Sequence, residues 1–369
     1  MPLHFTRTVL IAPLDWGLGH ATRCIPIIKI LKDKGIHLLI AAGGPQKILL
    51  QNEFPELEFL DIPGYEIRLS GRGKKLVWGL IFRVPAILNR IRKENAWLKI
   101  LCRQRKIDLI LSDNRYGFYH RSIPGIFITH QLYIQSGLGR GANRILMNLN
   151  HHFIRRFSEC WIPDFENPDS LAGILSHPPR LPGIPVRYAG ILSRFRKEES
   201  IISNPLLIMI SGPEPQRTVF ENKIFCELEN YQGRAVVVRG LPGNEDIFSL
   251  ANRQVSLFNH LESGPLNDLL NTSAFVICRS GYSTLMDLAR LQKKAILIPT
   301  PGQPEQEYLG TWLQDKKWAI TVSEKDFDLA KCMQIFHGES FGFPAFPETS
   351  LEKFMDDFFD SPLFSGGLR

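Results

Sequence analysis

This chain of 369 residues lacks the features that mark several large classes of protein. No apolar run reaches the roughly 18 residues that a membrane-spanning helix needs. Met1–Thr8 has no continuous apolar core of the signal-peptide kind, and no low-complexity tract or short-period repeat is present. We therefore expect a globular, cytoplasmic protein.

Cysteine is sparse and irregularly placed. The sequence holds six cysteines but no C-x-x-C pair, so neither a zinc site nor a disulfide framework is indicated. We expect buried free thiols. The cysteines are Cys24, Cys102, Cys160, Cys226, Cys278 and Cys332.

The composition is that of a water-soluble chain with an excess of positive charge. Hydrophobic residues make up 44% and charged residues 22%, and the formal net charge is +7. Such a balance favours an anionic partner but does not distinguish a nucleotide, a nucleic acid and an acidic lipid. The length allows two domains, each with its own core.

The first motif is a strand, a glycine loop and a helix. Thr8–Pro13 is a short apolar run typical of a strand buried on both faces, and Ile36–Ala42 supplies a second strand after the helix. The loop between them nearly matches G-x-G-x-x-G at Gly17 and Gly19, but Thr22 takes the third glycine position. Dinucleotide binding is therefore weakly indicated, and a glycine turn without a ligand is the alternative.

Polar residues follow two later strands of this half. Ile107–Ser112 and Ile126–Thr129 are apolar runs, and in a parallel sheet their ends open on the same edge as the glycine loop. We expect side chains from these ends to gather there. The residues concerned are Asp113, Asn114, Arg115, His130 and Gln131.

Arg68–Lys93 combines eight Lys or Arg residues, no acidic residue and many apolar ones. Such a mixture is typical of an amphipathic element on a membrane surface, with Trp78, Ile81 and Phe82 as the apolar anchors. The alternative is a basic surface helix with an ordinary core face. Pro85 is expected to interrupt any long helix here.

The second half repeats the alternation of strand and helix. Two such series without long strand-only runs predict an α/β protein of two Rossmann-like domains with parallel sheets, facing each other across a cleft. We expect domains at 1–190 and 205–345, a linker at 191–204, and a helix within 346–369 that packs back on the first domain. The strands of the second half are predicted at Leu206–Ser211, Val236–Arg239, Phe275–Cys278 and Ala295–Pro299.

Four local motifs carry a resemblance that covers nearly the whole chain in layout. Gly17–His20, Ser211–Pro213, Ser280–Asp287 and Gln303–Glu307 occur in the order of the glycine loops and the nucleotide-sugar signature of a known family. The chain resembles GT-B glycosyltransferases of the MurG-like family 28. The resemblance implies an inverting transfer from a UDP-sugar to a hydroxyl acceptor, with N-acetylglucosamine or a related hexose as the sugar. It also implies a basic, apolar patch that docks on the membrane.

The resemblance assigns most donor contacts to the second half. Asp287 would hold the ribose hydroxyls, and Gln306 with Glu307 would meet the sugar. The diphosphate needs N–H donors and cations, which a helix N-terminus and arginines supply. Surface charges are the alternative for the arginines and for Asp287. The donor candidates are Gly17, Gly19, Ser211, Gly212, Arg217, Arg239, Ser280, Gly281, Tyr282, Ser283, Thr284, Asp287, Gln303, Gln306 and Glu307, with Arg279 as a further cation.

The catalytic candidates lie in the first half. His20 is the expected base, because an imidazole titrates near working pH, and Asp113 or Asp15 would orient or replace it. A purely structural histidine is the alternative. No Asp-x-Asp pair follows a predicted strand, so we expect no obligatory metal or other cofactor. The acceptor-side candidates are Asp15, Asn114, Arg115, His130 and Gln131.

The sequence differs from the family at two places, and two other functions are alternatives to glycosyl transfer. The resembled family includes an enzyme that adds N-acetylglucosamine to the lipid-linked peptidoglycan precursor. His130-Gln131 lacks the acidic residue that follows the corresponding histidine in that enzyme, and prolines fill the Ser211 loop, so we expect a different acceptor. The rivals are a non-hydrolysing UDP-sugar 2-epimerase and a non-catalytic nucleotide-sugar binding protein. The expected partners are a nucleotide sugar, a lipid-linked or glycan acceptor and an anionic membrane surface on the cytoplasmic side, but no nucleic acid.

Overall fold

The structure is a computed structural model that describes residues 7–62, 74–167, 169–244, 250–346 and 351–365, with side chains from residue 85 onward in the helix that begins at Lys74. The chain forms two compact units. Unit 1 comprises Met1–Glu66, Val77–Leu192 and Glu348–Arg369. Unit 2 comprises Ile67–Leu76 and Ser193–Pro347, and its second segment begins inside the predicted linker.

Among the described residues, unit 1 holds a seven-stranded sheet in the order β3-β2-β1-β4-β5-β6-β7. Every neighbouring pair is parallel, as predicted. The central strands β1 and β4 are buried apart from Thr8 at the start of β1, because helices cover both faces of such a sheet. The strands are β1 (Thr8–Pro13), β2 (His37–Ala42), β3 (Glu58–Asp61), β4 (Leu109–Asp113), β5 (Gly125–Ile128), β6 (Glu159–Ile162) and β7 (Val186–Tyr188).

The helices of unit 1 include one that differs from the prediction. Helix α3 continues through Pro85, whereas the sequence predicted an interruption there. A proline removes one backbone hydrogen bond, and burial of Ile91, Leu98 and Leu101 further along stabilises the helix against that loss. The helices are α1 (Gly19–Asp33), α2 (Gly44–Glu53), α3 (Lys74–Gln104), α4 (Arg140–Ile154), α10 (Leu351–Phe359) and α11 (Pro362–Ser365), with a 3₁₀ turn η1 (Gly173–Leu175).

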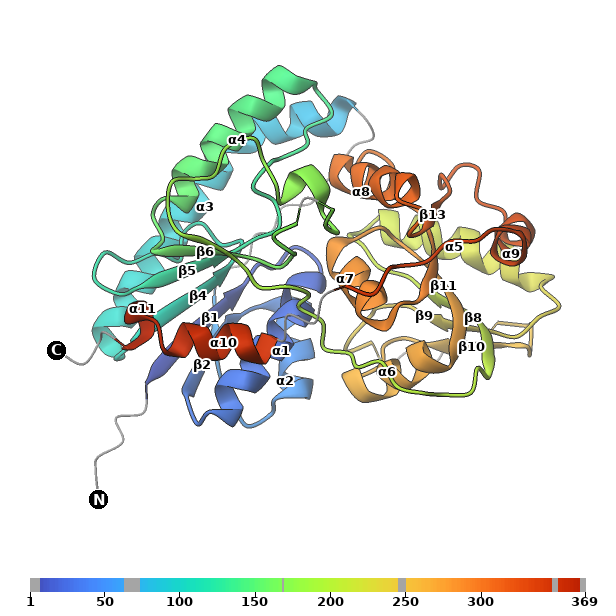
Figure 1. The fold of residues 1–369 in the computed structure, drawn as a ribbon, viewed down its shortest axis with the longest axis horizontal. Coiled ribbons are helices and arrows are strands. Elements are labelled where there is room, and N and C mark those ends of the chain that lie inside the picture. The colour runs from blue at the N-terminus through green and yellow to red at the C-terminus, as the bar shows by residue number, and fades with distance from the viewer. Residues whose placement is uncertain (1–6, 63–73, 168, 245–249, 347–350, 366–369) are drawn as a thin grey trace. The chain divides into compact units, whose positions relative to one another are not determined.

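The C-terminal helix α10 belongs to unit 1 although 155 residues of unit 2 precede it in the chain. Phe354 and Phe358 each meet the ring of Trp161 edge-on at 4.9 Å, and Lys34 at the end of α1 pairs with Asp356 at 2.6 Å. Figure 1 shows α10, in red, among the blue and green elements of unit 1.

Unit 2 has a second sheet, six-stranded within the described residues, in the order β10-β9-β8-β11-β12-β13 and again wholly parallel. Phe220, Phe275 and Ile296 belong to one buried cluster between the sheet and its helices. The elements are β8 (Asn204–Met209), α5 (Gln216–Glu229), β9 (Ala235–Val238), β10 (Val255–Phe258), α6 (Ser263–Thr272), β11 (Ser273–Cys278), α7 (Tyr282–Leu291), β12 (Lys294–Leu297), α8 (Pro304–Asp315), β13 (Ile320–Thr321) and α9 (Leu329–Gly338).

Candidate active site

A histidine and a carboxylate meet at the carboxyl edge of the unit 1 sheet. His20 lies in the first turn of α1, directly after the loop that follows β1, and Asp113 ends the neighbouring strand β4. Nδ1 of His20 is 3.3 Å from each carboxylate oxygen of Asp113. Gly17 makes the loop tight enough for this, with a φ of 76° that disfavours other residues. Parallel pairing thus joins residues 93 positions apart.

Arg23 completes this group. It lies one helical turn after His20 and is only 2% exposed. Its Nε donates to Oδ2 of Asp113 at 2.8 Å, its Nη2 contacts Oδ1 of the same carboxylate, and Nη2 is also 2.9 Å from Nδ1 of His20. His130, just beyond β5, is 3.3 Å from Nη1. The structure therefore brings the predicted His20, Asp113 and His130 together around an arginine.

Burial and charge set the protonation of this group. Burial alone would raise the pKa of Asp113, but Arg23 and His20 outweigh it and hold that pKa at about 2. For His20, burial lowers the pKa, Asp113 acts to raise it, and Arg23 again lowers it, so the net shift is downward. Asp113 is therefore a carboxylate and His20 a neutral imidazole near pH 7.

Other acceptor-side candidates have structural contacts. Arg115 is fully buried, contacts Glu94, donates to the carbonyl of Pro13 at 2.8 Å and lies 3.4 Å from Asp15. These contacts fix the chain after β1 and β4. They place Arg115 and Asp15 next to each other.

Asn114 follows β4 and Gln131 lies just beyond β5, and both make hydrogen bonds through their backbone groups. Asn114 has a φ of 56° and its N–H donates to the carbonyl of Ile128. The N–H of Gln131 donates to Oγ1 of Thr129 at 3.0 Å, and its carbonyl accepts from Asn150. Both residues thus shape the edge on which His20 and Asp113 lie.

In unit 2, the loop after β11 leads into α7, with Gly281 as the residue before the helix. The first turn, Tyr282 to Thr284, directs its backbone N–H groups and the positive end of the helix dipole toward this loop. Ser280 is buried, and its hydroxyl donates to the carbonyl of Gln306 at 2.8 Å, which ties the loop to helix α8. The geometry suits an anion at the start of α7.

Asp287, on the same helix, is 8% exposed and has a partner from outside the motif. The hydroxyl of Ser193 donates to its Oδ1 at 2.6 Å. Burial raises the pKa of Asp287 to about 6, although Arg194 and the Ser193 hydroxyl act in the opposite direction. This carboxyl group therefore titrates close to neutral pH.

The residues at the start of α8 form their own hydrogen-bond set. Oε1 of Gln306 accepts from the N–H of Thr300 at 2.9 Å, and its Nε2 donates to Gln303 at 2.8 Å. Glu307 is exposed and accepts from the N–H of Gly302 at 2.8 Å. Gln303 and Gln306 thus shape the Pro/Gly-rich loop, while Glu307 presents a carboxylate at its surface.

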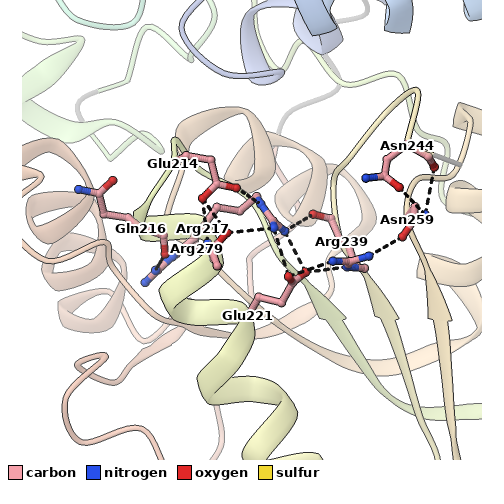
Figure 2. A network of polar contacts seen from close by, with 9 residues as sticks. Glu214, Gln216, Arg217, Glu221, Arg239, Asn244, Asn259 and Arg279 are labelled. Atoms are coloured by element: carbon pink, nitrogen blue, oxygen red, sulfur yellow. Dashed lines mark hydrogen bonds and ion pairs between the residues drawn. The ribbon is translucent and has the colours of Figure 1, made fainter. Parts of the chain in front are cut away.

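The three arginines predicted to face the nucleotide are paired with carboxylates, two of them through one residue (Figure 2). Glu221, which is 4% exposed, accepts from Arg217 at 2.9 and 3.2 Å and from Arg239 at 2.7 and 3.0 Å. Glu214 adds a contact of 2.7 Å to Arg217. Each of these two guanidinium groups thus has its positive charge offset inside unit 2.

Arg279 follows β11 and connects it to the residues that follow β12 and β13. It is 1% exposed, lies 2.5 Å from Glu324, and donates to the carbonyls of Ile298 and Gln216 at 3.1 and 3.2 Å. Ser211 and Gly212, with a φ of 119° at Gly212, form the loop between β8 and α5. In this arrangement Arg279 fixes the loops around α7 rather than presenting a solvated cation.

Sequence reasoning missed two arginines that the structure places beside candidates. The sequence places Arg23 shortly after the glycine loop, one helical turn after His20. Its contacts with Asp113 are seen only in the folded structure. Arg194 was assigned to the linker, yet its charge acts on Asp287 and its Nη1 donates to Ser263 at 3.1 Å. The one available signal was the helical spacing of His20 and Arg23.

The predicted membrane anchors Trp78, Ile81 and Phe82 lie outside the described side chains. Another exposed apolar surface is described on unit 1. Ile145 is 70% exposed, Leu138 and Leu149 are more than 40% exposed, and Arg140 and Arg144 lie among them. We name these five residues the α4 surface. Among the described residues, no helix is long and apolar enough to cross a membrane.

Comparisons with known proteins agree with the fold. Residues 247–334 match the glycosyltransferase family 28 C-terminal domain. An uncharacterized glycosyltransferase of Methanosarcina acetivorans is 25% identical over 325 residues, 83% of each chain. The UDP-N-acetylglucosamine--N-acetylmuramyl-(pentapeptide) pyrophosphoryl-undecaprenol N-acetylglucosamine transferase of Haemophilus ducreyi is also 25% identical, over 146 residues, which span 38% of this chain and 41% of that enzyme.

Solved structures share the architecture at low identity. MurG of Acinetobacter baumannii aligns over 90% of each chain with a TM-score of 0.51 and 13% identity. The spinosyn rhamnosyltransferase SpnG, complexed with spinosyn aglycone, covers 97% of this chain and 93% of its own with a TM-score of 0.57 and 16% identity. VinC, in complex with DTDP, has a TM-score of 0.53 and 12% identity, over 90% of this chain and 91% of its own.

The two parallel sheets, the family 28 domain and these relatives together make the chain a glycosyltransferase with the GT-B fold. Within that class it is MurG-like. The family 28 match covers α7, the loop before it and α8, where the donor candidates from Ser280 to Glu307 lie.

Proposed function

We propose that this glycosyltransferase moves N-acetylglucosamine or a related hexose from a UDP-sugar to a hydroxyl acceptor with inversion. The His20–Asp113 pair carries the proposal. Asp113 contacts Nδ1 of His20, whereas Nε2 has no hydrogen-bond partner in the described part of the chain. With its proton on Nδ1, the ring offers a lone pair at Nε2.

The chemistry needs one proton acceptor and one stabilised leaving group. Nε2 of His20 takes the proton of the acceptor hydroxyl while that oxygen attacks C1 of the sugar. The bond between C1 and the diphosphate oxygen breaks, and the nucleoside diphosphate leaves with the electron pair. Asp113 stabilises the imidazolium that forms, because its charge lies next to Nδ1. Attack opposite the leaving group inverts the anomeric centre.

The donor side of the proposal rests on helix α7. Its N-terminus would bind the diphosphate through backbone N–H groups, with Ser283 and Thr284 adding hydroxyls. Asp287 would accept hydrogen bonds from the two ribose hydroxyls. The Ser193 hydroxyl, 2.6 Å from Oδ1, holds the carboxylate in one orientation.

The affinity for UDP-N-acetylglucosamine should rise with pH through about 6, because an ionised Asp287 accepts both ribose hydrogen bonds and a protonated one does not. Binding at pH 5 should be about tenfold weaker than at pH 7.5. Calorimetry measures this well, since the diphosphate of a sugar nucleotide is esterified at both ends and does not titrate in this range.

Asp287→Asn should weaken binding about tenfold at pH 7.5 and remove the dependence on pH. Asp268→Asn is the matched control, because Asp268 is an exposed carboxylate on α6 of the same unit. An unchanged affinity for Asp287→Asn at pH 7.5 contradicts the ribose contact.

A two-stage experiment tests the transfer itself. UDP-, GDP- and dTDP-sugars are first compared for thermal stabilisation, and the best donor is then mixed with membrane lipid extract while nucleotide release is followed. NMR of the product gives its anomeric configuration. Release that depends on the acceptor supports transfer, whereas isomerised sugar without an acceptor supports an epimerase. No stabilisation by any nucleotide sugar rules out the proposed donor site.

We also propose a lipid-linked acceptor, presented at an anionic membrane. The α4 surface supports this, because exposed apolar side chains with basic neighbours suit the headgroup boundary. From Gln131 to Ser158 the sequence holds no acidic residue that would repel such a surface.

The double substitution Ile145→Ser, Leu149→Ser should reduce binding to phosphatidylglycerol vesicles about tenfold or more, since it removes two apolar anchors. Sedimentation with vesicles measures it. Ile100→Ser is the matched control, because Ile100 is 54% exposed on α3 of the same unit. Equal binding by the double variant and the control contradicts a role for the α4 surface.

A further inference from the structure

Arg23 is a buried neighbour of His20, the proposed base. Arg23 holds both oxygens of Asp113 and lies 2.9 Å from Nδ1 of His20 and 3.3 Å from Nδ1 of His130. With 2% of its surface exposed, its charge is shielded little by water. A buried cation in contact with both members of a catalytic pair affects the protonation of that pair.

A His–Asp pair alone has a weakness as a base. A carboxylate beside an imidazole favours the charged imidazolium, and an imidazolium cannot take a proton from the acceptor. The carboxylate is nevertheless needed to orient the ring and to stabilise the charge after proton transfer. A cation that contacts the same carboxylate weakens its preference for the imidazolium before and after proton transfer, and leaves the orientation of the ring intact.

The charges that face His20 are few and come from each element around it. Asp113 on β4 is negative and Arg23 on α1 is positive, so their charges act on His20 in opposite directions. His130, just beyond β5, lies 3.3 Å from Nη1 of Arg23. The thiol of Cys24, 3.7 Å from Asp113, stays protonated because burial, and then Asp113, raise its pKa.

Nδ1 of His20 faces both the carboxylate and the guanidinium. One neutral ring cannot bond to both through this nitrogen, since the arginine needs a lone pair there and the carboxylate needs a proton. The form with the proton on Nδ1 is the one that frees the lone pair of Nε2. In that form Arg23 acts on the ring through its charge rather than as a hydrogen-bond donor.

We propose that Arg23 is a positioning residue of the transfer reaction, whose guanidinium neutralises Asp113 and so keeps His20 uncharged at neutral pH. The proposal rests on His20 acting as the base. Arg23 itself touches neither the acceptor nor the donor in this scheme. Its effect passes through His20, so it should alter the pH at which the enzyme works more than its affinity for the donor.

Arg23→Met removes the charge and keeps much of the side-chain volume. Without the guanidinium, Asp113 is free to favour the imidazolium, so His20 loses its proton only at higher pH. The acid limb of kcat/KM should move up by about one pH unit or more, with activity lost on the acid side of the profile and regained at higher pH. Arg23→Lys, which keeps the charge, should leave the limb near its wild-type position.

An acid limb that stays in place for Arg23→Met, or activity lost equally at every pH in a folded variant, overturns the proposal and leaves Arg23 a purely structural residue. Circular dichroism and thermal unfolding show whether each variant is folded.

A measurement on the unaltered protein covers the case in which Arg23→Met does not fold. NMR of protein with ¹³C-labelled histidine, with the His20 signal assigned from His20→Asn, follows the titration of this ring directly. We expect His20 to be neutral at pH 7, and a protonated ring at that pH overturns the proposal. This titration does not depend on turnover, so it separates failure of the Arg23 proposal from failure of the transfer reaction.

Discussion

Replacing His20 with alanine should lower kcat by about 10²- to 10⁴-fold, the range that a positioned general base contributes. The acceptor hydroxyl would then lose its proton only to water, while the leaving diphosphate keeps its contacts in unit 2. Donor affinity should therefore change by less than about twofold, because the ribose and diphosphate candidates lie on α7. The change belongs in kcat and kcat/KM together.

Steady-state rates with saturating donor, alongside calorimetric titration with UDP, separate these two quantities. His37→Ala is the matched control, since His37 is an exposed histidine on β2 of the same unit. A wild-type rate for His20→Ala removes this residue from the mechanism. Weak donor binding with an unchanged rate at saturation would move its role from chemistry to the substrate complex.

Much of unit 1 could be predicted because its sheet leaves a simple trace in the sequence. Thr8–Pro13 is an unbroken apolar run, and it forms β1 with those bounds. Strands buried on both faces need such runs, and parallel strands end at one edge of the sheet. These two rules are enough to predict that His20 and Asp113, which are 93 residues apart in the sequence, lie close together at that edge.

Charge partners could not be predicted in the same way. Arg217 is a candidate phosphate ligand and Arg239 a candidate for the uracil side of the nucleotide, but the structure shows that Glu221 pairs with both. Glu221 and Arg217 are four residues apart on α5, a spacing visible in the sequence, whereas Arg239 comes from the end of β9 and joins them only when the sheet forms. The helical course of α3 through Pro85 is likewise decided by tertiary packing.

The Glu221 network gives the other large expected effect. Glu221→Gln removes the negative charge that two arginines share, so it leaves Arg217 with only the exposed Glu214 as a charged partner from α5 and its loop and removes the carboxylate from beside Arg239. Breaking a buried pair in this way costs about 3 kcal/mol of unfolding free energy. Glu214→Gln is the matched control, because the side chain of Glu214 is 55% exposed although it contacts the same Arg217. We expect that change to cost less than about 1 kcal/mol.

The pH dependence of this effect has a definite sign. Burial acts to raise the pKa of Glu221, but Arg239 and Arg217 outweigh it and lower that pKa below its usual value. A carboxylate with a lowered pKa in the folded state stabilises above the pKa of the unfolded chain, and the stabilisation is lost as pH falls through the folded value. The difference between wild type and Glu221→Gln should thus be full at pH 7 and shrink below about pH 4.

Chemical denaturation at several pH values measures this difference, and donor titration of the same variants decides what the arginines do. If Arg217 and Arg239 serve only to build unit 2, Glu221→Gln weakens the fold and leaves the affinity of the folded protein for UDP unchanged. If they bind the diphosphate, removing the carboxylate that they share leaves more of their positive charge for it, and the affinity for UDP rises. Equal stability of the Glu221 and Glu214 variants contradicts the network as a source of stability.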